Sequence, residues 1–461
     1  LPFAAPHFAE RLHGLYPEAS TLVSTLDGTL QSLCETLLAG FLRQHRAQGV
    51  VNASVMVVHA PSMAVRAYLG SADYFNRQIH GFVNGLKAPR SPGSTLKPFI
   101  YAQAMAQGLI TPDSRVKDTP LRMGYYQPEN FERNFYGPLS ATDALVRSRN
   151  IPAISLLAQL ERPTFHEFLL QAGIAIPKQA ANYGLSLAIG SAEISMEDLL
   201  RLYGLLANRG RLQNLRWLLD AEPDLGRPLM MPEAAFLVRE MLESNPRPQR
   251  SFGGRSFGQQ QIVAWKTGTS FGHRDAWAVG ISAGYAIGVW VGNMDGRAVA
   301  GISGAVHAGP ILFELFRALE PYGSRPAART GLNLATVEVC ADSRELPGPD
   351  CPRRVPATII PGRTRLTPCP IHRRTLVDAQ TGERLTADCA AGHEATTAAV
   401  TEYPAELVSW WRAAGIPFES PPPLAPDCLG TAGAGPRIVS PSPATVYAVR
   451  PDVPADFQQL T

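Results

Sequence analysis

Ser94 and Lys97, a serine and a lysine three residues apart, are the side chains of this sequence best suited to covalent chemistry. Pro92-Gly93 interrupts the chain just before them, and the apolar spacing from Leu96 to Leu109 predicts a helix that begins here. A serine hydroxyl becomes a nucleophile when a base takes its proton, and a buried lysine beside another cation can be that base. We therefore predict that Ser94, at a helix N-terminus that favours developing negative charge, is a nucleophile served by Lys97.

Lysine is rare in this chain, with five lysines against 37 arginines. Arginine keeps its proton and lysine can lose it, so lysines at Lys97 and Lys266 indicate that an amine is needed at both positions. A second Ser-x-x-Lys spacing, at residues 114–117, lies between two prolines. We expect a surface loop there, which shows that the spacing alone is a weak signal.

Ser148-x-Asn150 is the second motif, and Pro152 places it in a loop between two helices. Its hydroxyl and its amide are suited to hold the Lys97 amine. They can also relay a proton to a leaving amine.

Lys266-Thr267-Gly268 is the third motif, at the end of a predicted strand from Ile262 to Ser270. A cation and a hydroxyl suit a substrate carboxylate, and a glycine leaves room for a substrate backbone to pair alongside. We expect Thr267, Gly268, Thr269 and Ser270 to bind substrate. The backbone N–H groups of Ser94 and Thr269 would form an oxyanion hole.

The three motifs in this order resemble those of penicillin-binding proteins and class A β-lactamases. Residues 20–320 resemble the transpeptidase domain of class A penicillin-binding proteins in particular. Further matches are Tyr126-x-Pro128-x-Asn130, Ala144-Leu145-x-x-Ser148-x-Asn150-x-Pro152, Leu187-Ala188-Ile189-Gly190, Ala207-Asn208-Arg209-Gly210, Trp265–Ser270 and Arg274-Asp275-Ala276-Trp277.

Two positions depart from the family pattern. Arg149 stands in the middle of the second motif, a position that often varies in class A proteins. Trp265 precedes Lys266 where most relatives have glycine, and we expect its indole to narrow the β-lactam-binding cleft.

The resemblance implies a mixed α/β (α+β) fold of the penicillin-binding transpeptidase and serine β-lactamase type, with an antiparallel sheet flanked by helices. It implies a periplasmic D,D-transpeptidase that acts on peptidoglycan stem peptides and is acylated by β-lactams, with no cofactor and no metal. It also implies a possible periplasmic partner such as bacterial alpha-2-macroglobulin. The alternatives are a D,D-carboxypeptidase or β-lactamase, and a non-catalytic scaffold or sensor.

The net charge of +3 and the lack of a basic cluster give no sign of nucleic-acid binding. Residues 276–294 carry no charge, but their glycines and the turn at Ser282-Ala283-Gly284 favour two antiparallel strands over a membrane span. We therefore expect membrane attachment only through an anchor outside this chain. The preceding glycosyltransferase domain of the family is likewise absent, so we expect no glycan polymerisation.

Four segments are expected from the order of patterns along the chain. Residues 1–50 are a linker and N-terminal lobe, with a strand-like run from Thr21 to Leu26, and 51–322 are the transpeptidase domain. Residues 331–435 are a β-rich extension with many cysteines and prolines. Residues 436–461 resemble the truncated start of a C-terminal β-sandwich.

Five of the six cysteines gather in the last third of the chain, which favours disulfides in an oxidising compartment. The turn between Cys340 and Cys351 predicts one pair, and the turn between Cys369 and Cys389 a second. Cys428 is then expected to be free. In the alternative, Cys369 and His372 belong to a metal site with two more thiolates. Cys34 is expected to be a core residue.

Overall fold

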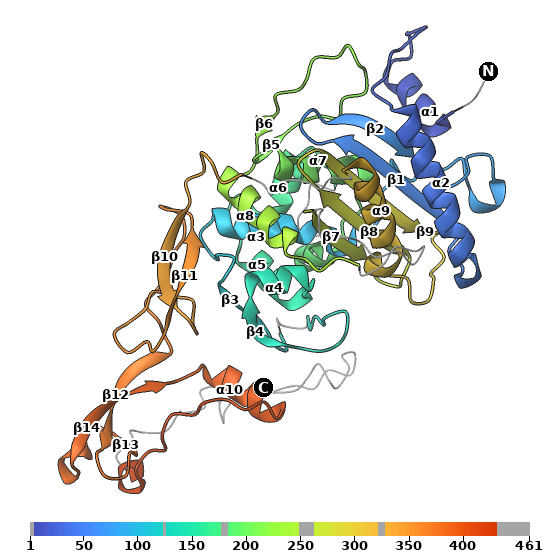
Figure 1. The fold of residues 1–461 in the computed structure, drawn as a ribbon. Coiled ribbons are helices and arrows are strands. Elements are labelled where there is room, and N and C mark those ends of the chain that lie inside the picture. The colour runs from blue at the N-terminus through green and yellow to red at the C-terminus, as the bar shows by residue number, and fades with distance from the viewer. Residues whose placement is uncertain (1–3, 123–125, 177–182, 249–261, 321–327, 431–461) are drawn as a thin grey trace, which may run out of the picture.

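The computed structural model describes residues 4–122, 126–176, 183–248, 262–320 and 328–430. Its main body is built on an antiparallel five-stranded sheet in the order β2-β1-β9-β8-β7 (Figure 1). The strands are β1 (Asn52–His59), β2 (Ala64–Leu69), β7 (Ala264–Thr269), β8 (Asp275–Ile281) and β9 (Tyr285–Gly292). The uncharged segment therefore forms the expected pair of strands, β8 and β9. Within the described ranges, no helix is long and apolar enough to cross a membrane.

Helices cover both faces of this sheet (Figure 1). Met56 and Val58 of β1 point into one apolar core, whereas Val55 and Val57 point into the other, as the twofold alternation of a strand requires. The first core contains α3 (Lys97–Ala106), α7 (Met196–Ala207) and α8 (Pro232–Glu243), and the second contains α2 (Gly28–His45) and α9 (Gly309–Leu319).

The helical lobe beside β7 carries the smaller elements that surround the site. They are β3 (Arg115–Asp118), β4 (Gly137–Ser140), α4 (Ala141–Val146), α5 (Asn150–Gln159) and α6 (Phe165–Gln171). The structure also contains α1 (Pro6–Leu15), β5 (Arg211–Leu212) and β6 (Arg227–Pro228).

Two local predictions were wrong. Residues 21–26 form no strand beyond an isolated bridge between Ser24 and Leu218. Residues 115–118 form β3, paired with β4, rather than a loop. The apolar Val116 is buried between exposed Arg115 and Lys117, so the alternation of a short strand outweighs the flanking prolines.

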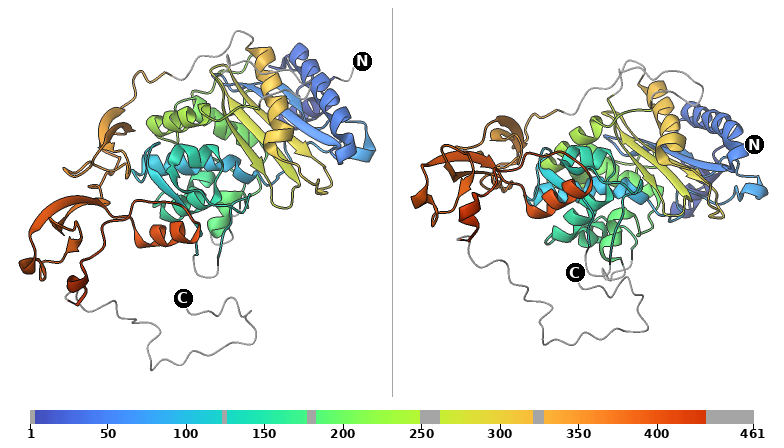
Figure 2. Two further views of the ribbon diagram at one scale, coloured as in Figure 1. Left: turned by 60° about the horizontal axis from the view of Figure 1, so that its bottom comes forward. Right: turned by 90° about the horizontal axis from the view of Figure 1, so that it is seen from below.

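The β-rich extension forms two small sheets that project from the main body on the side opposite α1 and α2 (Figures 1 and 2). The first is the hairpin of β10 (Ala335–Cys340) and β11 (Arg354–Ile359). The second contains β12 (His372–Asp378), β13 (Arg384–Leu385) and β14 (Ala395–Thr401), followed by α10 (Ala405–Ala413). The predicted β-sandwich start at 436–461 lies outside the described residues.

The expected cysteine pairs are wrong. Cys389 forms a disulfide with Cys428, with their Cα atoms 5.4 Å apart, so Cys428 is not free. Cys340, Cys351 and Cys369 are all reduced. The disulfide instead joins Cys389, which follows β13, to Cys428 in the 3₁₀ helix Pro426–Gly430. Cys34 is fully buried in α2, as expected.

Candidate active site

The nucleophile candidate Ser94 lies in a short 3₁₀ helix, Gly93–Leu96, that runs directly into α3. Two buried side chains hold this turn from opposite sides. The Tyr203 hydroxyl donates to the Thr95 carbonyl at 2.9 Å, and the Trp277 indole donates to the Ser91 carbonyl at 2.9 Å. Ser94 itself is partly buried, and its hydroxyl makes no hydrogen bond to another described residue, so its oxygen is available to a ligand.

Lys97 is fully buried one turn further on, with its amine held by three acceptors. Its Nζ donates to the carbonyls of Ser148 at 2.6 Å and Arg149 at 3.1 Å, and to Oδ1 of Asn150 at 2.7 Å. Burial, followed by the positive charges of Lys266 and Arg149, lowers the pKa of Lys97 well below its usual value. A lysine with a depressed pKa can hold a free amine and act as a base.

Ser148 lies between the two lysines of the site. Its hydroxyl accepts a hydrogen bond from Nζ of Lys266 at 2.7 Å, while its carbonyl accepts one from Lys97. The sequence predicted that the hydroxyl holds Lys97, so this detail was wrong: the backbone does so. Ser148 has a φ of 61°, an uncommon conformation for a residue other than glycine, and it turns the carbonyl and the hydroxyl toward different amines.

Lys266 comes from β7 and is as deeply buried as Lys97. Besides Ser148, its amine donates to the Thr267 carbonyl at 2.9 Å. Burial lowers the pKa of Lys266 to about 7. A carboxylate placed beside this amine would favour the ammonium form and raise the pKa again.

Arg149 fixes the loop that carries Ser148, a role the sequence did not show. Its guanidinium is buried and donates to the carboxylate of Asp118 at 2.8 Å, and Asp118 is itself fully buried at the end of β3. Asp118 also accepts from Asn130 at 2.7 Å and from the backbone of Tyr136 at 3.0 Å. The second motif is therefore fastened to the helical lobe by a satisfied buried ion pair.

Asn130 connects that ion pair to the loop that carries Ser148 and Asn150. Its side-chain oxygen accepts from the backbone N–H of Asn150 at 2.8 Å, while the Asn150 amide donates to the Glu129 carbonyl at 2.8 Å. These contacts aim Oδ1 of Asn150 at Lys97. The Tyr-x-Pro-x-Asn run was visible in the sequence, but this positioning function was not.

The strand β7 is the edge strand of the sheet. It lies directly against the nucleophile turn, which is the 3₁₀ helix Gly93–Leu96 with Pro92 before it. A Cβ atom added at Gly268 would lie 2.2 Å from the Pro92 carbonyl oxygen, and one at Gly93 would lie 2.8 Å from the backbone nitrogen of Thr269. Gly268 is therefore required for the contact between these two elements, a reason that the sequence did not suggest. The backbone of Thr269 is thereby brought beside the turn that contains Ser94.

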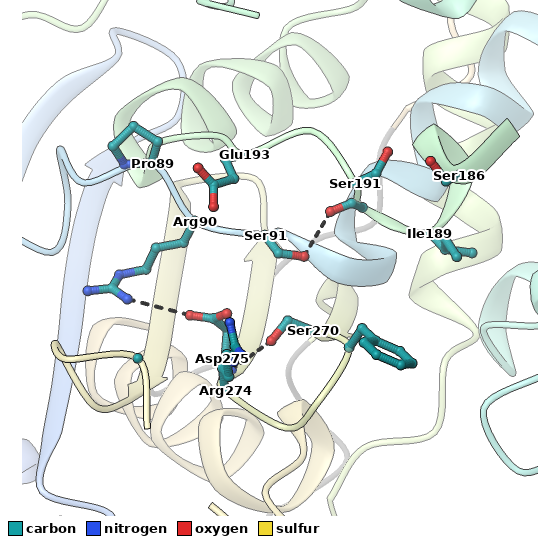
Figure 3. A pocket seen from close by; sticks show the side chains of 13 residues that line it. Pro89, Arg90, Ser91, Ser186, Ile189, Ser191, Glu193, Ser270, Arg274 and Asp275 are labelled. Atoms are coloured by element: carbon teal, nitrogen blue, oxygen red, sulfur yellow. Dashed lines mark hydrogen bonds and ion pairs between the residues drawn. The ribbon is translucent and has the colours of Figure 1, made fainter. Parts of the chain in front are cut away.

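Ser270, the residue after β7, lines a cavity of about 370 Å³ (Figure 3). Its hydroxyl accepts from the backbone N–H of Asp275 at 2.9 Å, which closes the turn between β7 and β8. In the same lining, Asp275 pairs with Arg90 at 3.6 Å, and Glu193 and Arg274 add a charge of each sign. This lining is suited to a polar, mixed-charge ligand.

The Trp265 indole does not narrow this region. It is buried in the core on the far face of the sheet, where it makes an edge-to-face contact with Phe313 of α9 at 5.0 Å. Successive side chains of a strand point to opposite faces, so Lys266 at the site places Trp265 behind it. The prediction of a narrowed cleft was wrong for this reason.

Comparisons with known proteins identify the family of this chain. Residues 53–292, more than half of the chain, match the family model described as the penicillin binding protein transpeptidase domain. The chain therefore belongs to the penicillin-binding protein transpeptidase family. Among individual relatives, it is 38% identical over 316 residues to penicillin-binding protein 1C of Escherichia coli (strain K12), covering 68% of this chain and 40% of that protein.

More distant relatives give the same family. Penicillin-binding protein 1A of Neisseria cinerea is 26% identical over 53% of this chain and 32% of its own length. The chain thus spans well under half the length of these relatives. The solved structure of penicillin-binding protein 1A from Haemophilus influenzae matches with a TM-score of 0.58 at 21% identity, over 69% of this chain and 54% of that one, which confirms the fold.

Proposed function

We propose that this chain is a serine-type D,D-transpeptidase that cross-links peptidoglycan stem peptides on the periplasmic side of the inner membrane. The hydroxyl of Ser94 attacks the carbonyl of the penultimate D-alanine, and its proton passes to Lys97. The terminal D-alanine leaves as an amine after it receives a proton. A side-chain amine of a second stem peptide then attacks the acyl-enzyme and restores Ser94.

The observation that carries the proposal is the pair of buried lysines joined through Ser148. Lys97, held by Asn150 and the loop backbone, is suited to be the base. The Ser148 hydroxyl bridges toward Lys266, so it can relay a proton to the leaving amine. A protonated Lys266 would bind the terminal carboxylate, with Thr267 beside it.

The oxyanion hole and the path of the bound peptide are assigned from the position of β7. The backbone N–H groups of Ser94 and Thr269 would stabilise the oxyanion, and the close contact of Gly93 with Thr269 supports this pairing. The stem peptide would pass along β7 toward Ser270 and the adjoining cavity. β-Lactams would enter as mimics of the dipeptide. PonA1 from Mycobacterium tuberculosis, which shares the fold at a TM-score of 0.57, has been solved in complex with penicillin V. From the family resemblance, a periplasmic partner such as bacterial alpha-2-macroglobulin is a further proposal.

Intact-protein mass spectrometry after incubation with a labelled penicillin tests the nucleophile. We expect a stable adduct of one penicillin per chain on the wild type and none on Ser94→Ala, with unchanged thermal unfolding of the variant. Rapid turnover of the penicillin would instead identify a β-lactamase. A chain that never reacts would identify a non-catalytic scaffold or sensor.

A donor stem pentapeptide with and without an acceptor amine distinguishes the remaining alternative. A transpeptidase forms the amide-linked dimer and releases D-alanine when the acceptor is present. A D,D-carboxypeptidase releases D-alanine at the same rate without the acceptor and forms no dimer, and that outcome would contradict the proposal.

A further inference from the structure

Three cysteines and one histidine meet in the β-rich extension, far from the active site in sequence. They are Cys340 at the end of β10, Cys351 before β11, Cys369 before β12, and His372 as the first residue of β12. Their ligand atoms all lie within 4.8 Å of one another. The His372 side chain is 4% exposed, and Cys340 is fully buried.

The spacing of these atoms is that of a tetrahedral metal centre. Nδ1 of His372 lies 3.3 Å from Sγ of Cys340 and 3.4 Å from Sγ of Cys369. With zinc–sulfur bonds near 2.3 Å and zinc–nitrogen bonds near 2.0 Å, a tetrahedron separates sulfur and nitrogen ligands by about 3.5 Å. The four atoms would need to move only slightly to bind one ion.

The groups around the cluster are those that support metal ligands. The second nitrogen of His372, Nε2, faces a carboxylate oxygen of Asp342 at 3.4 Å, so that the histidine can present Nδ1 to a metal. Cys369 accepts from the Ser343 hydroxyl at 3.2 Å, and Cys351 accepts from the backbone N–H of Gly348 at 3.2 Å. Hydrogen bonds of this kind stabilise thiolates.

A disulfide is the competing explanation, and the cluster fits it poorly. The chain does form one, between Cys389 and Cys428. At the cluster, however, three sulfur atoms share one histidine, so any disulfide would leave an odd thiol and an unused imidazole. A site with three thiolates and one imidazole uses all four groups.

We propose that Cys340, Cys351, Cys369 and His372 bind one structural Zn²⁺ ion. Three thiolates with one imidazole in tetrahedral array select zinc among the common divalent metals, and four protein ligands leave no open position for catalysis. The ion would tie the β10–β11 hairpin to the start of β12. This inference goes beyond the proposed transpeptidase activity and does not depend on it.

The site would also fix how the extension meets the main body. Asp342, beside the ligand His372, accepts a hydrogen bond through its backbone carbonyl from Nε of Arg115 in β3, at 3.2 Å. The extension has a small apolar core of its own, centred on Leu385, Ala425 and Cys428. A metal is a common means of stabilising such a small domain.

Elemental analysis of the full chain, purified without chelator, tests the site. We expect about one zinc per chain in the wild type, and a loss of most of it in Cys369→Ser and Cys351→Ser. Cys34→Ala, in the core of the main body, is the matched control and should keep its zinc. Replacement of zinc by Co²⁺ should give the visible absorption of tetrahedral cobalt bound by three thiolates, which a cluster with two of its cysteines joined in a disulfide cannot give.

Asp342→Asn provides a test that leaves all four ligands in place. We expect it to weaken zinc affinity by about 10–100-fold in a competition with a chromogenic chelator. Glu338→Gln, a change at an exposed carboxylate of β10 that pairs with Arg354 at 3.8 Å, should leave the affinity unchanged. Equal affinities of both variants and the wild type would contradict the role given to Asp342 and weaken the proposed coordination.

Thiol titration in denaturant without reductant decides against the disulfide. We expect four reactive thiols per chain once the metal is released, those of Cys34 and the three cluster cysteines. A linked pair within the cluster together with zinc-free protein would overturn the proposal. Penicillin acylation of Cys369→Ser separates the two proposals, because it should persist when zinc is lost.

Discussion

Lys266 and Lys97 are both buried, and the positive charge of Lys266 lowers the pKa of Lys97. Lys266→Gln removes the neighbouring cation but keeps a polar side chain within reach of Ser148. A nearby positive charge lowers the pKa of Lys97, so its removal must raise that pKa. The free amine of Lys97 would then be populated only at higher pH.

We therefore expect the rising limb of the penicillin acylation rate to move to higher pH in Lys266→Gln. Stopped-flow measurement with a fluorescent penicillin between about pH 5 and pH 10 would follow it. Lys87→Gln, a change at an exposed lysine, is the matched control. A limb that stays in place or moves to lower pH would rule out Lys97 as the base.

Asp118 neutralises the buried Arg149, and the two carboxylates near this arginine allow a sharp comparison. Asp118→Ala leaves a buried guanidinium without its partner, so we expect a loss of about 3–5 kcal/mol in the free energy of unfolding, with slower acylation. Glu132→Ala removes a carboxylate that is 60% exposed and 3.4 Å from the same arginine, so we expect a loss below about 1 kcal/mol. Urea unfolding monitored by fluorescence measures both, and similar losses would contradict the assignment.

The chemistry of single residues was largely readable from the sequence, but their supports were not. Hydrogen bonds join Lys97, Ser148, Asn150 and Lys266, and Ser94 lies in the turn just before Lys97. Asp118 was missed because a lone aspartate carries no local pattern, and Trp277 was named only as part of a family match, without its supporting role. Their partners lie 31 residues away for Asp118 and 186 residues away for Trp277.

At the scale of elements, the contact between β7 and the nucleophile turn sets the width of the site. Gly268→Ala would place a methyl group 2.2 Å from the Pro92 carbonyl oxygen, so the two elements must separate. We expect a destabilisation of about 1–3 kcal/mol. Since displacement of reacting groups is costly, acylation should slow by about tenfold or more.

Gly14→Ala is the control for this change, because a Cβ atom at Gly14 in α1 meets nothing within 4 Å. It should leave acylation unchanged and stabilise the helix slightly. Thermal unfolding and the acylation rate, measured on the same preparations, compare the two variants. An unchanged rate in Gly268→Ala would show that the contact does not control the site.

Most helices and the five strands of the sheet were predictable because their apolar periods are long and regular. The error at residues 115–118 arose because proline spacing was given more weight than a four-residue alternation, and a strand this short is defined mainly by its partner β4. The prediction of a strand at residues 21–26 was wrong for the opposite reason. It has apolar side chains but no neighbouring strand to pair with beyond one bridge.

At the scale of the whole molecule, the disulfide between Cys389 and Cys428 closes a loop of 39 residues within the extension. In the chain-entropy treatment, such a loop contributes about 4 kcal/mol. We expect Cys428→Ser to lower the unfolding temperature of the extension and leave acylation unchanged. Calorimetry with and without bound penicillin assigns the transitions, since the ligand should shift only that of the main body.

A lower unfolding temperature for both transitions would contradict the independence of the extension from the main body.

The disulfide pairing itself could not be read from the sequence, because five clustered cysteines allow many arrangements and spacing does not decide among them. The tertiary fold of the extension decides instead, by placing the 3₁₀ helix Pro426–Gly430, which contains Cys428, beside Cys389.

The short strand β3 connects the β-rich extension to the active site. At one end Arg115 binds the extension, and at the other Asp118 holds the loop that presents Ser148 to the two lysines. A ligand of the extension that displaced β3 would alter the active site through this strand. Thermodynamic linkage makes the coupling mutual: occupation of the active site would change the affinity of that ligand by the same factor.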